Sequence, residues 1–198
     1  MSIRVYKTTL KNTHLGVSIK KPDWSLYTQF IIDVEKTPAT NSIASSNAIA
    51  LAELEFYDSE QNKISYATTT TDTTTSLSNY WNDNKWDRTN LSDGAKSFTD
   101  VYAGERNATI ICSVTNGYGW GRFLVNIPTA NVDEIRYYVS LEFNRIPEYF
   151  RAYAIPADVV YNRTRHLAQR DNSDLLLVWE HHNDYSNLQG NMVFSSKG

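Results

Sequence analysis

The sequence predicts an all-β protein, a β-sandwich or jelly roll of about 8–10 strands. Two observations carry this prediction. Apolar and polar residues alternate in many short segments, with the period of two that is typical of a strand with one buried face. Long stretches with helical periodicity are nearly absent, and only the segment near 157–169, after Pro156, fits one short helix. A chain of 198 residues can bury a core without disulfides or metals.

Each predicted element rests on its local pattern. Alternation or an apolar run predicts strands near 15–19, 27–34, 50–57, 64–67, 109–114, 123–127, 135–143, 150–154 and 175–181. The segment 175–181 is expected to be the last strand, and its leucine and valine residues predict burial on both faces. The threonine-rich stretch 68–76 suits a strand or an extended loop, since threonine is β-branched. The polar stretch 78–104 is a long loop, and loops of this length in compact domains are usually functional. The pattern predicts one domain over 1–185 and a polar C-terminal tail over 186–198.

Composition narrows the function classes. The net charge is −3 and the sequence pI about 5.8, so no overall basic field favours nucleic-acid binding. No apolar run is long enough for membrane insertion, and the first residues lack the pattern of a secretory signal. Cys112 is the single cysteine, which fits folding in a reducing compartment. We expect a protein made in a cytoplasm that stays there or leaves by another route, such as assembly into a virion.

Three segments resemble one known family. Residues 49–58 are similar to a strand with a leucine-alanine-glutamate motif, 90–94 to an asparagine-leucine-threonine-aspartate-glycine loop, and 144–153 to an arginine-x-proline-x-x-phenylalanine loop and strand. Together they resemble the discoidin-like, galactose-binding-like family, which includes coagulation-factor type C domains and many carbohydrate-binding modules. The glutamate-bearing strand comes early here rather than last, and Phe98 replaces the usual tryptophan after the loop. The single cysteine, the threonine- and asparagine-rich loops, the C-terminal arm and the lack of a secretory signal pattern together resemble the discoidin-like modules of bacteriophage tail fibres and baseplates.

The resemblance implies a jelly roll and a structural calcium ion. Its matching positions here are Glu53 on the early strand and Asp93 in the aspartate–glycine loop, with loop carbonyl groups as further oxygen ligands. The alternative is a side-chain turn at Asp93 and a solvated Glu53.

Aromatic residues in the predicted loops are candidates for ligand contact. Tyrosine and tryptophan offer rigid, amphipathic faces for sugars or proteins, and connecting loops of a sandwich gather at its ends. Trp120 is out of phase with the buried face of 123–127, and its flanking glycines make a regular strand there unexpected. The alternative is that rings such as Trp81 or Trp86 pack in the core. The candidate ligand-binding residues are Trp81, Asp83, Trp86, Asn116, Tyr118, Trp120 and Arg122.

The remaining motifs give weaker indications of function. His181 and His182 point to opposite faces if the strand continues, so they share no metal ion. The basic segment 163–170 suits an anionic ligand or an acidic partner, and a solvated helix face is the alternative. No motif for nucleophilic or metal-dependent catalysis is present, and Cys112 fits a small apolar residue in a strand.

These observations lead to two main hypotheses, and a third is a glycan-active enzyme that uses a pair of carboxylates. The first is a non-enzymatic carbohydrate- or receptor-binding module, a phage tail-fibre or baseplate component for host attachment, with a cell-surface glycan as partner. The second is a structural virion protein whose jelly roll docks other subunits, or copies of itself, without binding glycan. Ligand identity and oligomeric state stay open.

Overall fold

The computed structural model describes most of the chain. The described residues are 23–37, 48–73, 91–92, 94, 109–113, 118–129, 131–140, 146–183 and 191–197. Their strands are β1 (Gln29–Lys36), β2 (Ala48–Leu51), β3 (Glu53–Tyr57), β4 (Lys63–Ile64), β5 (Ala67–Thr73), β6 (Thr109–Ser113), β7 (Gly119–Asn126), β8 (Glu134–Ser140), β9 (Tyr149–Ala154), β10 (Leu176–His182) and β11 (Asn191–Ser195). Two short helical turns, η1 (Trp24–Leu26) and η5 (Thr164–Ala168), complete the elements. No helix among these residues is long and apolar enough to cross a membrane.

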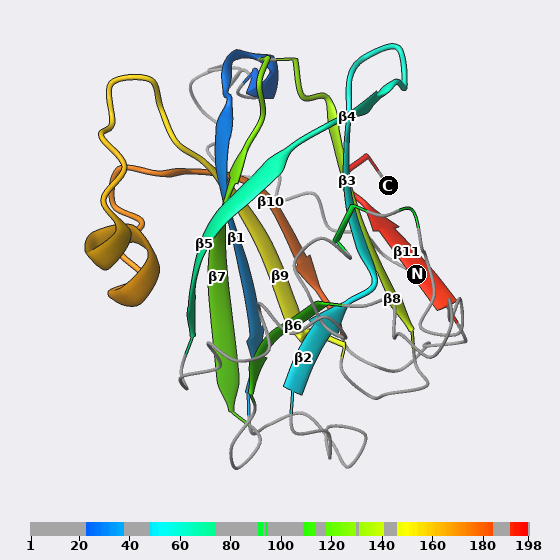
Figure 1. Ribbon diagram of the computed structural model, residues 1–198, viewed down its shortest axis with the longest axis vertical. Coiled ribbons are helices and arrows are strands. Elements are labelled where there is room, and N and C mark those ends of the chain that lie inside the picture. Colours follow the sequence, from blue (N-terminus) through cyan, green and yellow to red (C-terminus); the bar gives the residue numbers. More distant parts are fainter. Residues whose placement is uncertain are drawn as a thin grey trace, which may run out of the picture.

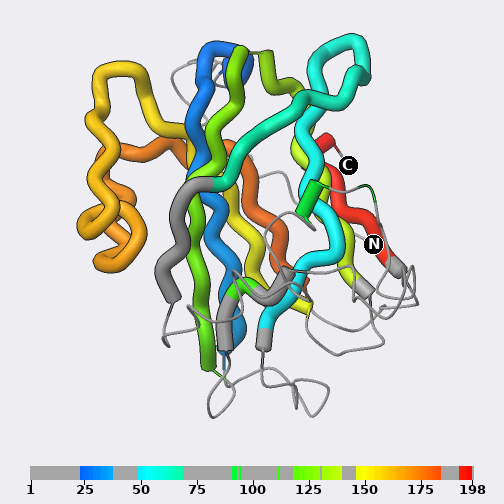
Figure 2. Tube along the Cα trace, in the orientation of Figure 1, coloured from blue at the N-terminus to red at the C-terminus, as the bar shows by residue number. Residues whose placement is uncertain are grey.

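The strands form an antiparallel sandwich, as Figures 1 and 2 show. One sheet has the order β10-β9-β1-β7-β5, the other has the order β11-β8-β3-β4, and β2 pairs with β6. All strand pairs among the described residues are antiparallel. The all-β sandwich predicted from alternation is therefore confirmed, whereas a jelly-roll order of the strands stays a prediction.

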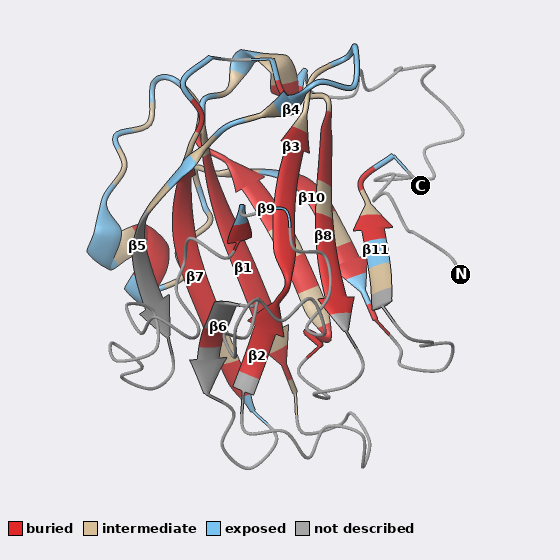
Figure 3. Ribbon diagram, turned by 45° about the vertical axis from the view of Figure 1, so that its right-hand side comes forward, coloured by how far each residue is buried: buried red, intermediate tan, exposed pale blue. Residues whose placement is uncertain are grey.

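The central strand β1 is buried on both faces. Phe30, Ile32 and Val34 point into the main core between the sheets. Ile31 lies on the outer face of the five-stranded sheet, in a second and smaller apolar cluster. Figure 3 shows this burial running through the strands at the centre of the molecule. An outer-face residue is buried only where something covers it, so β1 must have a cover on that side.

Residues 156–175, here called the strap, provide that cover. The strap leaves the sheet after β9 and returns at β10, and it contains η5, one turn of π-helix (Figure 1). Leu167 of this turn is fully buried against Ile31, Leu124 and Tyr153. The short helix predicted near 157–169 is therefore present as this single turn.

The structure corrects several local predictions. Residues 191–195 of the predicted polar tail form β11, which pairs with β8 and places Phe194 in the core. The strand predicted over 175–181 is not the last, because β11 follows it. It is not buried on both faces either, since β10 is an edge strand among the described strands and Leu177 is 38% exposed. Gly119 and Gly121 do not interrupt β7, which begins at Gly119.

Candidate functional site

Three transverse rows of side chains cross the outer face of the five-stranded sheet. The first is apolar: Leu177 of β10 lies opposite Tyr153 of β9, which lies opposite Ile31 of β1, and Ile31 lies opposite Leu124 of β7. Residues that lie directly opposite each other on neighbouring strands point to the same face of the sheet, so their side chains meet there. The strap packs against this row. The next two rows carry the polar and aromatic groups of the candidate site.

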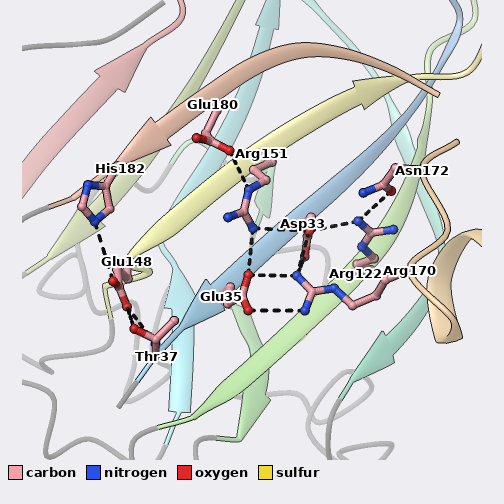
Figure 4. Close-up of polar contacts among 10 residues, drawn as sticks. All are labelled: Asp33, Glu35, Thr37, Arg122, Glu148, Arg151, Arg170, Asn172, Glu180 and His182. Carbon is pink, nitrogen blue, oxygen red and sulfur yellow. Dashed lines mark hydrogen bonds and ion pairs between the residues drawn. The ribbon is translucent and has the colours of Figure 1, made fainter. Parts of the chain in front are cut away.

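The second row alternates in charge from strand to strand. Glu180 of β10 lies opposite Arg151 of β9. Asp33 of β1 lies opposite Arg151 on one side and Arg122 of β7 on the other. Figure 4 shows these side chains joined along the sheet, with Arg170 of the strap added to them. Opposite charges in direct register favour this strand order.

Asp33 and Arg122 form a buried ion pair at the centre of the second row. Their side chains are 1% and 0% exposed, and Arg122 Nη2 lies 3.0 Å from Asp33 Oδ2. Buried charges are tolerated only when they are paired and hydrogen-bonded. Arg122 Nη1 donates to the carbonyl oxygen of His166 at 2.7 Å, and Nη2 donates to Oδ1 of Asn172 at 2.9 Å. The same guanidinium therefore fastens the strap to the sheet.

Two further arginines connect Asp33 to Glu35. Arg170 Nη2 lies 2.9 Å from Glu35 Oε2 and 3.1 Å from Asp33 Oδ2. Arg151 Nη1 donates to the same Glu35 oxygen at 2.8 Å. Burial raises the pKa of Glu35, but the hydrogen bonds from Arg170 and Arg151 outweigh it and hold that pKa below the usual 4.5. Glu35 is therefore ionised at neutral pH.

The carboxylates act on the arginines in return. Burial lowers the pKa of Arg151, but hydrogen bonds to Glu35 and Glu180 raise it above its usual value. The pKa of Arg170 is raised against burial by Glu35 and Asp33 in the same way. Glu35, Arg151 and Arg170 thus stabilise one another's charged forms.

The third row combines aromatic and polar side chains. Glu35 lies opposite Trp120 of β7 and Tyr149 of β9, and Tyr149 lies opposite His182 of β10. The imidazole of His182 stacks on the ring of Tyr149, with centroids 4.6 Å apart and planes 17° apart. His182 is half exposed. It also lies 3.6 Å from Glu148 Oε1, a carboxylate whose other oxygen accepts hydrogen bonds from Thr37.

Two guanidinium groups lie over the aromatic rings of this row. The Arg151 group is 4.6 Å from the centroid of Tyr149, and the Arg170 group is 5.0 Å from the centroid of Trp120. Both distances are in the range of cation–π attraction. Arg170 has a left-handed backbone, with φ 54°, which costs a residue other than glycine about 1–2 kcal/mol. Its contacts with Trp120 and with the two carboxylates of β1 offset that cost.

Tyr149, Arg151, Glu180 and His182 form a two-by-two array, here called the β9–β10 quartet. Arg151 uses Nε for Glu180 Oε2 and Nη1 for Glu35. Arg151 Nη2 and Glu180 Oε1 have no hydrogen-bond partner in the described part of the chain, and neither is among the buried polar atoms that lack one. Both atoms therefore reach solvent. Figure 4 shows them on the side of the network that faces His182.

The structure places three of the predicted ligand-binding residues. Trp120 lies on the outer face, as its phase relative to 123–127 predicted, and is partly exposed. Tyr118 comes just before β7 and is 40% exposed. Arg122 is buried in the ion pair, so it does not present its guanidinium to a ligand at the surface. Trp81, Asp83, Trp86 and Asn116 lie outside the described residues.

Glu53, the predicted calcium ligand, is buried on the outer face of the four-stranded sheet. Its Oε2 accepts a hydrogen bond from the backbone N–H of Gly94 at 3.1 Å, which brings it to the aspartate–glycine loop. Asp93 itself lies outside the described residues. Lys63 Nζ lies 2.8 Å from Glu53 Oε1 and balances its charge. No group of three or more metal-ligating side chains occurs among the described residues, and the calcium site stays a prediction.

The arginines of the predicted basic segment that are described below bond carboxylates of the same chain, and the two adjacent histidines of β10 differ in exposure. His181 is buried and His182 exposed, so they do point to opposite faces. Arg165 of the predicted basic segment bonds Asp171 and Asp174 within the strap, and Arg170 bonds β1. The segment is therefore largely neutralised by neighbouring carboxylates rather than presented as a basic surface.

Sequence reasoning missed Glu35, Tyr149 and Glu180 as site residues. Each lies at an outward position of a strand, and the register that brings them together joins segments more than 100 residues apart, such as β1 and β9. The signal available in the sequence was the alternation itself, which places Asp33 and Glu35 on one face of β1.

No protein-family model, no curated protein and no solved structure gives a significant match to this chain. The resemblance to discoidin-like modules therefore stays a prediction.

Proposed function

We propose that this chain is a non-enzymatic binding module that recognises a carbohydrate on the outer face of the five-stranded sheet, at the β9–β10 quartet and Trp120. The observation that carries the proposal is the combination of aromatic rings with rigidly held charged groups that still have unused hydrogen-bonding atoms. A sugar ring presents C–H groups that pack on aromatic side chains and hydroxyl groups that need donors and acceptors. Groups already fixed by the ion network lose little conformational entropy on binding.

The charge balance of the site favours a neutral ligand. Arg122, Arg151 and Arg170 are matched by Asp33, Glu35 and Glu180. A site for nucleic acid or another polyanion needs an excess of unpaired positive charge. Neutral glycans need only local donors and acceptors, and these are what the quartet offers.

The protonation state of Glu35 argues against its use as the general acid of a hydrolase. A general acid must carry a proton near the working pH. The pKa of Glu35 is held below its usual value by two arginines, so this carboxylate is ionised. Asp33 and Glu180 each accept a hydrogen bond from a guanidinium group.

A module of this kind suits attachment to a cell surface. Its place in a phage tail fibre or baseplate stays a prediction, as does the alternative of a virion subunit that docks other proteins without glycan. Scattered exposed apolar side chains such as Leu26 and Val160 give that alternative no particular support, since single exposed apolar residues are normal.

A glycan array followed by calorimetry tests the proposal. Trp120→Ala and Tyr149→Ala are each expected to weaken binding of the strongest array ligand about tenfold, the loss of one aromatic contact. The matched control is Tyr57→Ala, because Tyr57 also lies under an arginine, Arg136 at 4.1 Å, but on the opposite sheet. Absence of binding to any glycan, or an equal loss in the Tyr57 variant, would refute the proposal.

A further inference from the structure

The Arg151–Glu180 pair presents two charged atoms at one edge of the site. Arg151 Nε donates to Glu180 Oε2 at 2.7 Å, and the two residues lie directly opposite each other on β9 and β10. Nη2 lies on the same edge of a guanidinium group as Nε, so it faces the side of Glu180. The bond therefore leaves a charged donor, Nη2, beside a charged acceptor, Oε1, and both reach solvent.

The pair is held firmly in this arrangement. Both side chains are mostly buried, with exposed fractions of 17% for Arg151 and 14% for Glu180. The Arg151 guanidinium packs on the ring of Tyr149 and donates a hydrogen bond from Nη1 to Glu35. A donor and an acceptor that are positioned before the ligand arrives can discriminate between ligands by geometry.

Two neighbouring hydroxyl groups match this donor and acceptor. Each sugar hydroxyl can both donate and accept, so one hydroxyl can accept from Nη2 while the next donates to Oε1. Both bonds are charge-assisted and therefore stronger than bonds between neutral groups. A ligand that lacks one of the two hydroxyls leaves a desolvated charged atom unpaired, which a polar site penalises strongly.

We infer that Arg151 and Glu180 recognise a vicinal diol, two hydroxyl groups on adjacent ring carbons, and thereby set the sugar preference of the site. This inference rests on the proposed carbohydrate-binding function and names its ligand class. It assigns Arg151 Nη2 as the donor and Glu180 Oε1 as the acceptor. Trp120, on the far side of β1, then contacts the remainder of the glycan.

The test uses a matched pair of methyl glycosides, the preferred sugar from the array and its analogue without one hydroxyl of the diol. Calorimetry with the full chain is expected to show at least about tenfold weaker binding of the deoxy analogue. Glu180→Gln is expected to weaken binding of the complete glycoside about tenfold and to shrink the difference between the two glycosides, which shows that the hydroxyl and the carboxylate are coupled. Asp171→Asn is the control, because it makes the same change in another arginine–carboxylate pair, with Arg165.

Arg151→Lys provides a second variant, since it keeps the charge but removes both Nε and Nη2. Circular dichroism establishes that each variant is folded. If the complete glycoside binds but the deoxy analogue binds equally well, or both variants at the pair bind like the parent protein, the diol inference is overturned while the binding function stands. If no glycoside binds at all, both the function and the inference fail.

Discussion

Replacement of Arg122 by methionine isolates the buried ion pair that joins the sheet to the strap. Methionine keeps most of the aliphatic volume but removes the charge from beside Asp33, which is 1% exposed. Removing one partner of a buried pair costs about 3–5 kcal/mol, because the other charge loses its compensation. Here Arg170 remains 3.1 Å from the Asp33 carboxylate and Arg151 remains 3.7 Å away. The cost should therefore lie near the lower limit, about 3 kcal/mol.

Arg165→Met is the matched control for this prediction. Arg165 also contacts two carboxylates, Asp171 and Asp174, each at 2.6 Å, but its side chain is 37% exposed. Ion pairs at the surface are screened by solvent, so this variant should lose little stability. The two variants thus differ mainly in burial.

Urea denaturation at neutral pH, followed by tryptophan fluorescence, measures both variants. A loss of about 3 kcal/mol corresponds to a decrease in Tm of about 6–12 °C for a domain of this size. Equal losses for the two arginines, or a loss below about 1 kcal/mol for Arg122→Met, would refute the claim that the Asp33–Arg122 pair is a buried structural element.

Three other predictions concern acid stability, the strap and calcium. Burial raises the pKa of Glu134, but hydrogen bonds from Arg136 and Ser195 outweigh it and lower that pKa to about 2. The ionised Glu134 therefore stabilises the folded state above pH 4.5, and this stabilisation is lost as the pH falls toward 2. Glu134→Gln should therefore be less stable than the parent protein at pH 7 but not at pH 2, and urea midpoints across this range that differ by a constant amount would contradict it. Leu167→Ala should cost about 2–4 kcal/mol and speed amide exchange in the strap more than in β1, whereas uniform exchange rates would show that the strap does not open separately. Millimolar calcium should raise the Tm modestly, and more in Lys63→Ala, because Lys63 competes with calcium for Glu53; the absence of any calcium-dependent shift in either protein would contradict the metal prediction.

The fold class was predictable because most core strands have one clearly apolar face. Alternation located β1, β3 and β8, and it placed Phe30, Ile32 and Val34 together on the buried side. The phase of Trp120 relative to Phe123 also gave its face correctly. These properties are local, since they depend only on the period of two in an extended chain.

The candidate site was not predictable because it depends on the order of the strands in the sheet and on the strap that covers the sheet's outer face. The Asp33 and Arg122 side chains meet across 89 positions of sequence, and nothing local indicates which strands become neighbours. The sequence did hold a clue to the strap. Ile31 lies among polar outward positions of β1, and an apolar residue there indicates that part of the outer face is covered.

The tail and β10 were predicted wrongly for a related reason. Asn191–Ser195 is short and polar at both ends, so its pairing with β8 has no local pattern to reveal it. The apolar run at Leu176–Val178 resembles a strand buried on both faces, but β10 lies at the sheet edge with a register shift between Leu177 and Trp179. Such irregularities are common at sheet edges, where they discourage pairing with other chains.

Amide chemical-shift mapping during titration with the strongest array glycan tests most directly whether the outer face of the five-stranded sheet binds sugar. The largest changes are expected at residues 149–151 and 180–182 and at Trp120. Changes confined to the four-stranded sheet, or to residues 81–86, would contradict binding at this face, and so would a titration that moves no resonance.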